Sequence, residues 1–179
     1  RWSFVHLPKI LHEYATRIQP IPKRLKKLVW LLQQTGRYIF KMFEIKNNFS
    51  LKKLNTFGVE SHAHWYVQID SETDLKELFA DAKWKNEDLL VLGGGSNTLF
   101  VNNFDGLVVR VHICGINHQI DGDVIYVTAG AGEVWNDVVN YCVDHHFAGL
   151  ENLSLIPGSV GASPIQNIGA YGVELMDVF

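Results

Sequence analysis

A glycine-rich segment near the end of the chain reads Ile156-Pro-Gly-Ser-Val-Gly-Ala-Ser-Pro-Ile-Gln-Asn-Ile-Gly-Ala-Tyr-Gly172. It holds four glycines and two prolines in 17 residues, and no Asp, Glu, Lys or Arg. Glycine lets main-chain N–H groups approach a ligand without an intervening Cβ, while Pro157 and Pro164 restrict the backbone between the glycines. This composition indicates a main chain that lies close to a bound molecule.

A second glycine-rich stretch, Gly93-Gly-Gly-Ser-Asn97, follows the apolar run Asp88–Leu92. Two such stretches in one chain suggest a large anionic ligand, such as a dinucleotide, held mainly by main chain. Thr98 stands where a Rossmann G-x-G-x-x-G pattern needs glycine, and no Gly-Lys-Ser/Thr occurs for a Walker A loop. The stretch therefore predicts a nest of N–H donors beside the Ser96 hydroxyl and the Asn97 amide. A tight turn with a purely structural role would have the same sequence pattern and is the alternative.

Strand and helix patterns alternate around these loops. We expect a helix that Ser71 caps and that ends near Trp84, and a second helix after Ala129-Gly-Ala-Gly132. The apolar face of the second helix comprises Val134, Trp135, Val138, Val139 and Cys142. Strands are expected at Trp65–Ile69, Asp88–Leu92, Leu107–Val111 and Val124–Thr128.

Charge is unevenly distributed along the 179 residues. Residues 1–50 carry a net charge of +8 and residues 51–179 a net charge of −11, which together give the overall −3. The acidic second part argues against nucleic-acid binding, which needs a basic surface. We expect residues 1–41 to be a basic N-terminal extension, either upstream sequence that is not native or an accessory amphipathic segment, and residues 42–179 to form the folded domain.

The apolar run Leu28–Leu32 is far shorter than the roughly 20 residues of a membrane-spanning helix. We therefore expect no membrane span. Cys114 and Cys142 fit reduced thiols in a cytoplasmic protein, although a disulfide between them is left open.

A long string, Leu150-Glu-Asn-Leu-Ser-Leu-Ile-Pro-Gly-Ser-Val-Gly-Ala-Ser-Pro-Ile-Gln-Asn-Ile-Gly-Ala-Tyr-Gly-Val-Glu-Leu175, joins Asn55-Thr-Phe-Gly58 and the Gly93 loop in a recognisable order. From Asn48 to Phe179 the sequence resembles the UDP-N-acetylenolpyruvoylglucosamine reductase family, also called UDP-N-acetylmuramate dehydrogenase. The resemblance implies an α+β FAD-binding domain of the vanillyl-alcohol oxidase and p-cresol methylhydroxylase (PCMH) type, built from two small α/β subdomains. It also implies that residues 42–179 are this domain, incomplete at its C-terminus and without the substrate domain.

The resemblance assigns roles to the glycine loops. It implies that the FAD pyrophosphate is cradled by Gly93, Gly94, Gly95, Ser96 and Asn97. It implies that Pro157, Gly158, Ser159, Gly161, Ala162, Ser163 and Ile168 run along the cofactor. Tyr171 would face the substrate, with a tyrosine packed in a glycine turn as the alternative.

The implied reaction is the NADPH-dependent reduction of UDP-N-acetylglucosamine enolpyruvate to UDP-N-acetylmuramate, through FAD, in peptidoglycan precursor synthesis. The family's catalytic serine, arginine and glutamate are expected downstream of Phe179, and Arg110 does not match that arginine. We therefore expect no catalytic residue in this chain, a monomer that binds FAD weakly, and no turnover by the chain alone.

Two other functions remain open. An FAD-dependent oxidase of the same superfamily should carry a His or Cys in its loops for covalent flavin attachment, and the glycine segments hold neither. The second alternative function is that of a nucleotide-binding module without catalytic activity. The pairs His62/His64 and His145/His146 are read as solvated or capping side chains, and no metal site is expected.

Overall fold

The computed structural model describes residues 43–178, which belong to the second of two units of the chain, Lys41–Phe179. The basic segment 1–41 and Met42 therefore lie outside the described residues.

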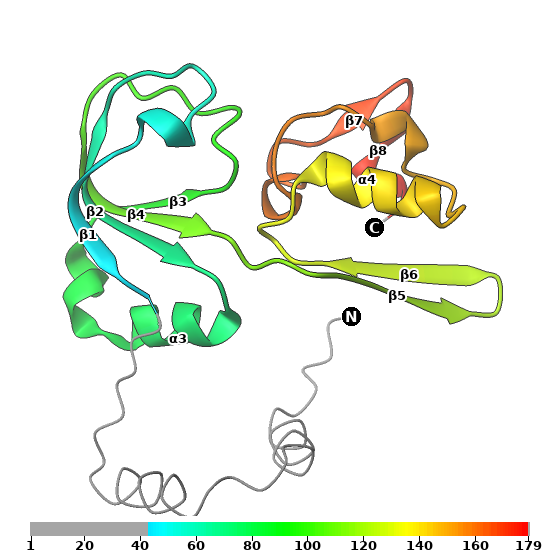
Figure 1. Ribbon diagram of the computed structural model, residues 1–179, viewed down its shortest axis with the longest axis horizontal. Helices are drawn as coiled ribbons and strands as arrows, with labels where there is room; N and C mark the ends of the chain where they lie inside the picture. Colours follow the sequence, from blue (N-terminus) through cyan, green and yellow to red (C-terminus); the bar gives the residue numbers. More distant parts are fainter. Residues whose placement is uncertain (1–42, 179) are drawn as a thin grey trace, which may run out of the picture. The chain divides into compact units, whose positions relative to one another are not determined.

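A four-stranded sheet forms the first part of the described chain (Figure 1). Its strands are β1 (Ile45–Ser50), β2 (His62–Ile69), β3 (Leu89–Leu92) and β4 (Phe104–Val111). They lie in the order β1-β2-β4-β3, with β1 antiparallel to β2 and the other pairs parallel. The apolar residues of β2 and β4 alternate between two hydrophobic cores, one on each face of the sheet.

Helix α3 (Glu72–Ala80) packs on one face of the sheet. As predicted, Ser71 caps it, since the Ser71 hydroxyl accepts a hydrogen bond from the Asp74 N–H at 3.1 Å. The predicted end near Trp84 is wrong, because Asp81 takes an extended conformation and its carboxylate accepts from the Lys83 N–H at 3.0 Å, which starts a 3-10 helix, Ala82–Asn86. Trp84 nevertheless enters the core beneath α3.

The opposite face of the sheet has its own core. It contains the β-strand side chains of Ala63, Tyr66, Leu92 and Val108, covered by Leu51 and Phe100. A 3-10 turn, Lys52–Leu54, follows Leu51 along this face.

The second part of the described chain begins with the hairpin β5 (Ile116–Asp121) and β6 (Val124–Ala129), followed by α4 (Trp135–Asp144). Trp135, Val138, Val139 and Cys142 are buried as the spacing predicts, whereas Val134 is 52% exposed because it precedes the first helical turn. The α4 face packs with Leu153, Ile168 and Leu175 into a third core. The short pair β7 (Gly169–Ala170) and β8 (Val173–Glu174) closes this part.

The prediction of an α+β fold rather than a doubly wound sheet is confirmed, since β3 leads through the Gly93 loop into β4 with no helix between them. Across residues 43–178, no helix is long and apolar enough to cross a membrane.

Candidate functional site

The two glycine-rich loops, distant in sequence, touch each other. A Cβ added to Gly93 would overlap the Ser159 hydroxyl oxygen and lie 3.7 Å from the Ala162 Cβ. A Cβ added to Gly94 would lie 3.7 Å from the main chain of Gly158. Only glycine permits this approach at Gly93 without displacing the Ser159 side chain. The Gly93 loop (Gly93–Asn97) and the Gly158 loop (Ile156–Gly172) therefore form one site.

Gly95 packs against the segment Leu54–Thr56 and is hydrogen bonded to it. Its φ is +66°, and a Cβ there would overlap the Leu54 carbonyl oxygen and lie 2.8 Å from the Leu54 carbonyl carbon. The Gly95 carbonyl accepts hydrogen bonds from the Thr56 N–H at 3.2 Å and from the Thr56 hydroxyl at 3.3 Å. Main chain therefore packs directly against main chain at this position.

Asn55 holds that supporting segment in place. Its side chain is 7% exposed and donates to the carbonyls of Leu51 and Val59, at 2.9 and 3.0 Å, while accepting from the Val59 N–H at 3.0 Å. The string Asn55-Thr-Phe-Gly58 thus has a structural role, because Asn55 orients Leu54, the residue whose carbonyl packs against Gly95.

The Gly93 loop carries main-chain donors that the protein does not use. Among the described residues, none accepts a hydrogen bond from the N–H groups of Gly94, Gly95, Ser96 or Asn97. Successive N–H groups in a turn can together bind an anion when no internal acceptor uses them. The loop therefore fits a phosphate held by neutral donors.

The Gly158 loop is held by the residues that lead into α4. The Gly158 carbonyl accepts from the Trp135 N–H at 3.0 Å, and the N–H groups of Val160 and Gly161 donate to the carbonyls of Glu133 and Ala131, both at 2.9 Å. A Cβ on Gly161 would lie 2.9 Å from the Ala131 Cβ, so packing within the protein already accounts for that glycine.

A cavity of about 290 Å³ lies between the two loops. Four of the residues predicted for the cofactor line it, namely Ser96, Asn97, Pro157 and Ile168. Sequence reasoning missed Gln166, which also lines the cavity and donates from its side-chain amide to the Pro157 carbonyl at 3.3 Å. An amide in an uncharged glycine segment was the available signal for it.

The remaining predicted residues fall into two groups. Gly93, Gly94, Gly158 and Ser159 form the contact between the loops, and Ala162 lies beside it. Ser159 and Ser163 are buried, and the Ser163 hydroxyl donates to the Val160 carbonyl at 2.6 Å, which gives this side chain a role within the loop itself.

Tyr171 is 90% exposed, and its φ is +56°. The side chain is therefore not packed in the glycine turn. Among the described residues it forms no hydrogen bond or ring contact, so the phenol remains available to a ligand.

Left-handed backbone is concentrated near this site. Leu155, Asn167 and Tyr171 all have positive φ although none is glycine. Leu155 is 84% exposed, and its N–H donates to the Asn136 side chain at 2.7 Å, which helps to hold it there. Such backbone conformations are costly and cluster at functional sites, although Asn48 and His146 also have positive φ elsewhere in the described chain.

Three of the histidines in the described part of the chain form hydrogen-bond contacts with other side chains. His64 contacts the Asp105 carboxylate at 3.1 Å, His112 contacts Asp70 at 2.8 Å, and His118 bonds the Tyr141 hydroxyl at 2.6 Å. Within the described part of the chain, no group of three or more His, Cys, Asp or Glu side chains is arranged to hold a metal ion.

Residues 63–179 match the FAD binding domain family, and the chain belongs to this family. It is similar to curated UDP-N-acetylenolpyruvoylglucosamine reductases, with 46% identity over 137 residues to that of Flavobacterium johnsoniae and 47% over 137 residues to that of Amoebophilus asiaticus. Each match covers 76% of this chain and 40% of the relative, in the relative's N-terminal part.

The solved structure of UDP-N-acetylenolpyruvylglucosamine reductase from Thermus caldophilus has the same fold over 75% of this chain and 46% of that one. The TM-score is 0.55 and the sequence identity 24%. The predicted family and the predicted FAD-binding fold are therefore confirmed, and the chain spans less than half the length of these relatives.

Proposed function

We propose that this chain is the FAD-binding part of an NADPH-using reductase that converts UDP-N-acetylglucosamine enolpyruvate to UDP-N-acetylmuramate, a cytoplasmic step of peptidoglycan precursor synthesis. The similarity to the curated reductases supports the choice of reaction. The observation that carries the proposal is the contact between the Gly93 and Gly158 loops, which leaves a row of N–H donors free.

The residues present fit the cofactor. Neutral donors hold phosphate without a lysine, and the glycines provide room for the main chain to approach it. We assign the FAD pyrophosphate to Gly93, Gly94, Gly95, Ser96 and Asn97. We assign the rest of the cofactor to Pro157, Gly158, Ser159, Gly161, Ala162, Ser163 and Ile168.

When bound, FAD supplies the hydride transfer, while the protein binds and orients the reacting groups. Tyr171 is assigned to the substrate, because its exposed phenol can donate a hydrogen bond to a phosphate or carboxylate oxygen. We assign no catalytic proton donor to the chain, and propose that it is a monomer that holds the cofactor without turning over.

Cofactor binding is tested by titrating the purified chain, residues 1–179, with FAD and following the visible flavin spectrum and flavin fluorescence. We expect a yellow protein with saturable binding. A folded protein that cannot be loaded with FAD would contradict the proposal.

A matched pair of asparagines tests the position of the site. Asn97 lines the cavity between the loops and Asn86 lies at the end of the 3-10 helix after α3; both are exposed and neither side chain forms a hydrogen bond within the described residues. We expect Asn97→Ala to weaken FAD binding several-fold and Asn86→Ala to leave it unchanged. Equal affinities in the two variants would remove the Gly93 loop from the site.

The reaction is tested separately by adding NADPH and the enolpyruvyl sugar nucleotide to the FAD-loaded chain. We expect no sustained NADPH oxidation above the buffer control. Turnover at the rate of an intact relative would show that the chain carries its own proton donor.

A further inference from the structure

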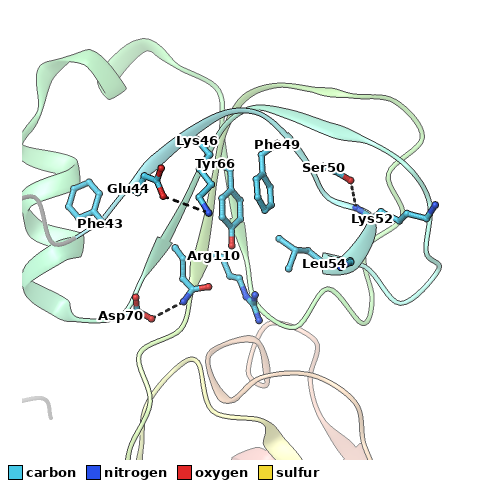
Figure 2. Close-up of a pocket in the computed structure, with 12 residues that line it drawn as sticks. Phe43, Glu44, Lys46, Phe49, Ser50, Lys52, Leu54, Tyr66, Asp70 and Arg110 are labelled. Atoms are coloured by element: carbon cyan, nitrogen blue, oxygen red, sulfur yellow. Dashed lines mark hydrogen bonds and ion pairs between the residues drawn. The ribbon is translucent and has the colours of Figure 1, made fainter.

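A second, larger cavity of about 710 Å³ opens on the sheet face opposite α3 (Figure 2). Lys46 of β1, Tyr66 and Gln68 of β2, and Arg110 of β4 reach it from that face, since Lys46 pairs with Tyr66 and Gln68 pairs with Arg110 in the strand register. Its lining residues come from the sheet, from the turn Lys52–Leu54 and from residues that directly flank β1 and β2, namely Phe43, Glu44 and Asp70; none comes from the Gly158 loop.

Positive charge exceeds negative charge in the lining. Four cations, Lys46, Lys52, Lys53 and Arg110, face two carboxylates, Glu44 and Asp70.

The carboxylates near the cavity are already engaged. Glu44 lies 3.8 Å from the Lys46 ammonium, and the Asp70 carboxylate accepts from Gln68 at 2.9 Å and contacts His112 at 2.8 Å. Lys52 pairs at 3.5 Å with Glu60, which lies outside the cavity. Among the described residues, Lys53 and Arg110 have no carboxylate within ion-pair distance.

An aromatic pair provides the apolar part of the lining. The Phe49 and Tyr66 rings stack with their centroids 4.0 Å apart, and Tyr66 is 4% exposed. The Arg110 side chain lies near the Tyr66 hydroxyl (Figure 2). Burial raises the pKa of Tyr66, with Arg110 opposing this shift, so the phenol stays neutral; the negative charge that acts on the guanidinium is that of Asp70, beyond ion-pair distance.

The cavity adjoins the Gly93 loop without being part of it. Arg110 pairs with Leu92, the residue before Gly93, and Leu54 presents its carbonyl to Gly95 while its side chain lines the cavity. The turn Lys52–Leu54 therefore has the Gly93 loop on one side and the cavity on the other.

We propose that this cavity binds a phosphate-bearing small molecule, with its phosphate at Arg110 and Lys53 and its apolar part against Phe49 and Leu54, at a site separate from that of the flavin. The planar guanidinium matches phosphate geometry, and the volume is that of a small-molecule pocket. The net charge of −11 over residues 51–179 opposes a polyanion such as nucleic acid. The inference does not depend on the proposed reductase function.

ATP serves as the probe, titrated calorimetrically into the full chain at low salt, with and without saturating FAD, and adenosine serves as the phosphate-free comparison. We expect ATP to bind in both cases and adenosine not to bind. Arg110→Gln and Lys53→Gln should each weaken ATP binding at least about tenfold, because a charge-assisted contact to phosphate is lost. The control Lys76→Gln removes a cation from α3, on the other face of the sheet, and should change nothing.

Several results would overturn the proposal: no ATP binding in the absence of FAD, displacement of ATP by FAD, or an equal loss in Lys76→Gln. Lys53 is exposed and forms no hydrogen bond within the described residues, so Lys53→Gln decides the question even if Arg110→Gln does not fold. If the chain fails to bind FAD but binds ATP in an Arg110-dependent way, the proposed function fails and this inference stands.

Discussion

At the scale of single residues, substitutions at the neighbouring positions Gly94 and Gly95 should affect different properties, FAD binding and stability respectively. A Cβ at Gly95 would meet the Leu54 carbonyl at positive φ, whereas one at Gly94 would make only ordinary contacts of 3.7 Å and beyond. We expect Gly95→Ala to lower the free energy of unfolding by about 1–3 kcal/mol, since the new strain is in the backbone. Urea denaturation of the FAD-free chain measures this loss.

The neighbouring substitution should do the opposite. Gly94→Ala should leave the urea midpoint unchanged and weaken FAD binding about tenfold, because the methyl group would project from an exposed loop whose N–H groups we assign to the FAD pyrophosphate. A Gly94→Ala chain that binds FAD like the parent would show that the cofactor does not approach this residue.

Asp70 gives a pH dependence. Its hydrogen bond with His112, and to a smaller extent that from Gln68, holds the pKa of the carboxyl below its ordinary value of 3.8. The stability that it contributes is therefore present above the unfolded-state pKa and is lost as pH falls through the folded-state pKa. Because the side chains are partly exposed, we expect at most about 1 kcal/mol.

The variant Asp70→Asn isolates this contribution. Its unfolding free energy should be lower than that of the parent at about pH 5.5 and should converge with it below about pH 3. A difference that stays constant across this range would assign the effect of the substitution to packing instead of charge.

At the scale of elements, the start of α3 depends on one hydroxyl. Ser71 accepts from the Asp74 N–H at 3.1 Å and its hydroxyl also donates to the Asp74 carboxylate at 2.7 Å. Ser71→Ala should cost about 1 kcal/mol of stability, the usual value for an N-cap. Thermal melting measures the cost, and Ser71→Asp, which can still accept from the N–H group, should restore part of it.

Strong local patterns made most elements predictable. The strands around Tyr66, Leu90, Val109 and Val127 are rich in apolar or β-branched residues, and the α4 face repeats at helical spacing. Strand β1 reads Ile-Lys-Asn-Asn-Phe-Ser and was missed, since this polar edge strand exists through its pairing with β2. Strand β5 is equally polar and depends on β6.

The site was predictable only where glycine marks it. The loops at Gly93 and Gly158 stand out by composition, and their contact is what the structure adds. The supporting amides of Asn55 and Gln166 bond to carbonyls, an arrangement that follows from the folded backbone; the only local signal was the Gln166 amide within an uncharged glycine segment. The Arg110 cavity was missed because its cations come from separate elements, namely β1, the turn Lys52–Leu54 and β4.

At the scale of the whole molecule, a cofactor that binds the folded chain alone must stabilise it. At an FAD concentration 100 times the dissociation constant, the gain should be about 2.7 kcal/mol. We expect the melting temperature to rise steadily with FAD concentration in differential scanning calorimetry. A melting temperature that is independent of FAD, in a chain with a bound-flavin spectrum, would place the flavin on the unfolded chain as well.

The contact between Gly93 and Ser159 also bears on the order of folding. The sheet and its two cores form between residues 43 and 111, whereas this contact closes a long loop through the hairpin and α4. Loop closure carries an entropic cost that local pairing does not. We therefore expect the two loops to come together late in folding and to part early in unfolding. A dinucleotide that touches both would act there as a reversible cross-link, and would slow the first step of unfolding.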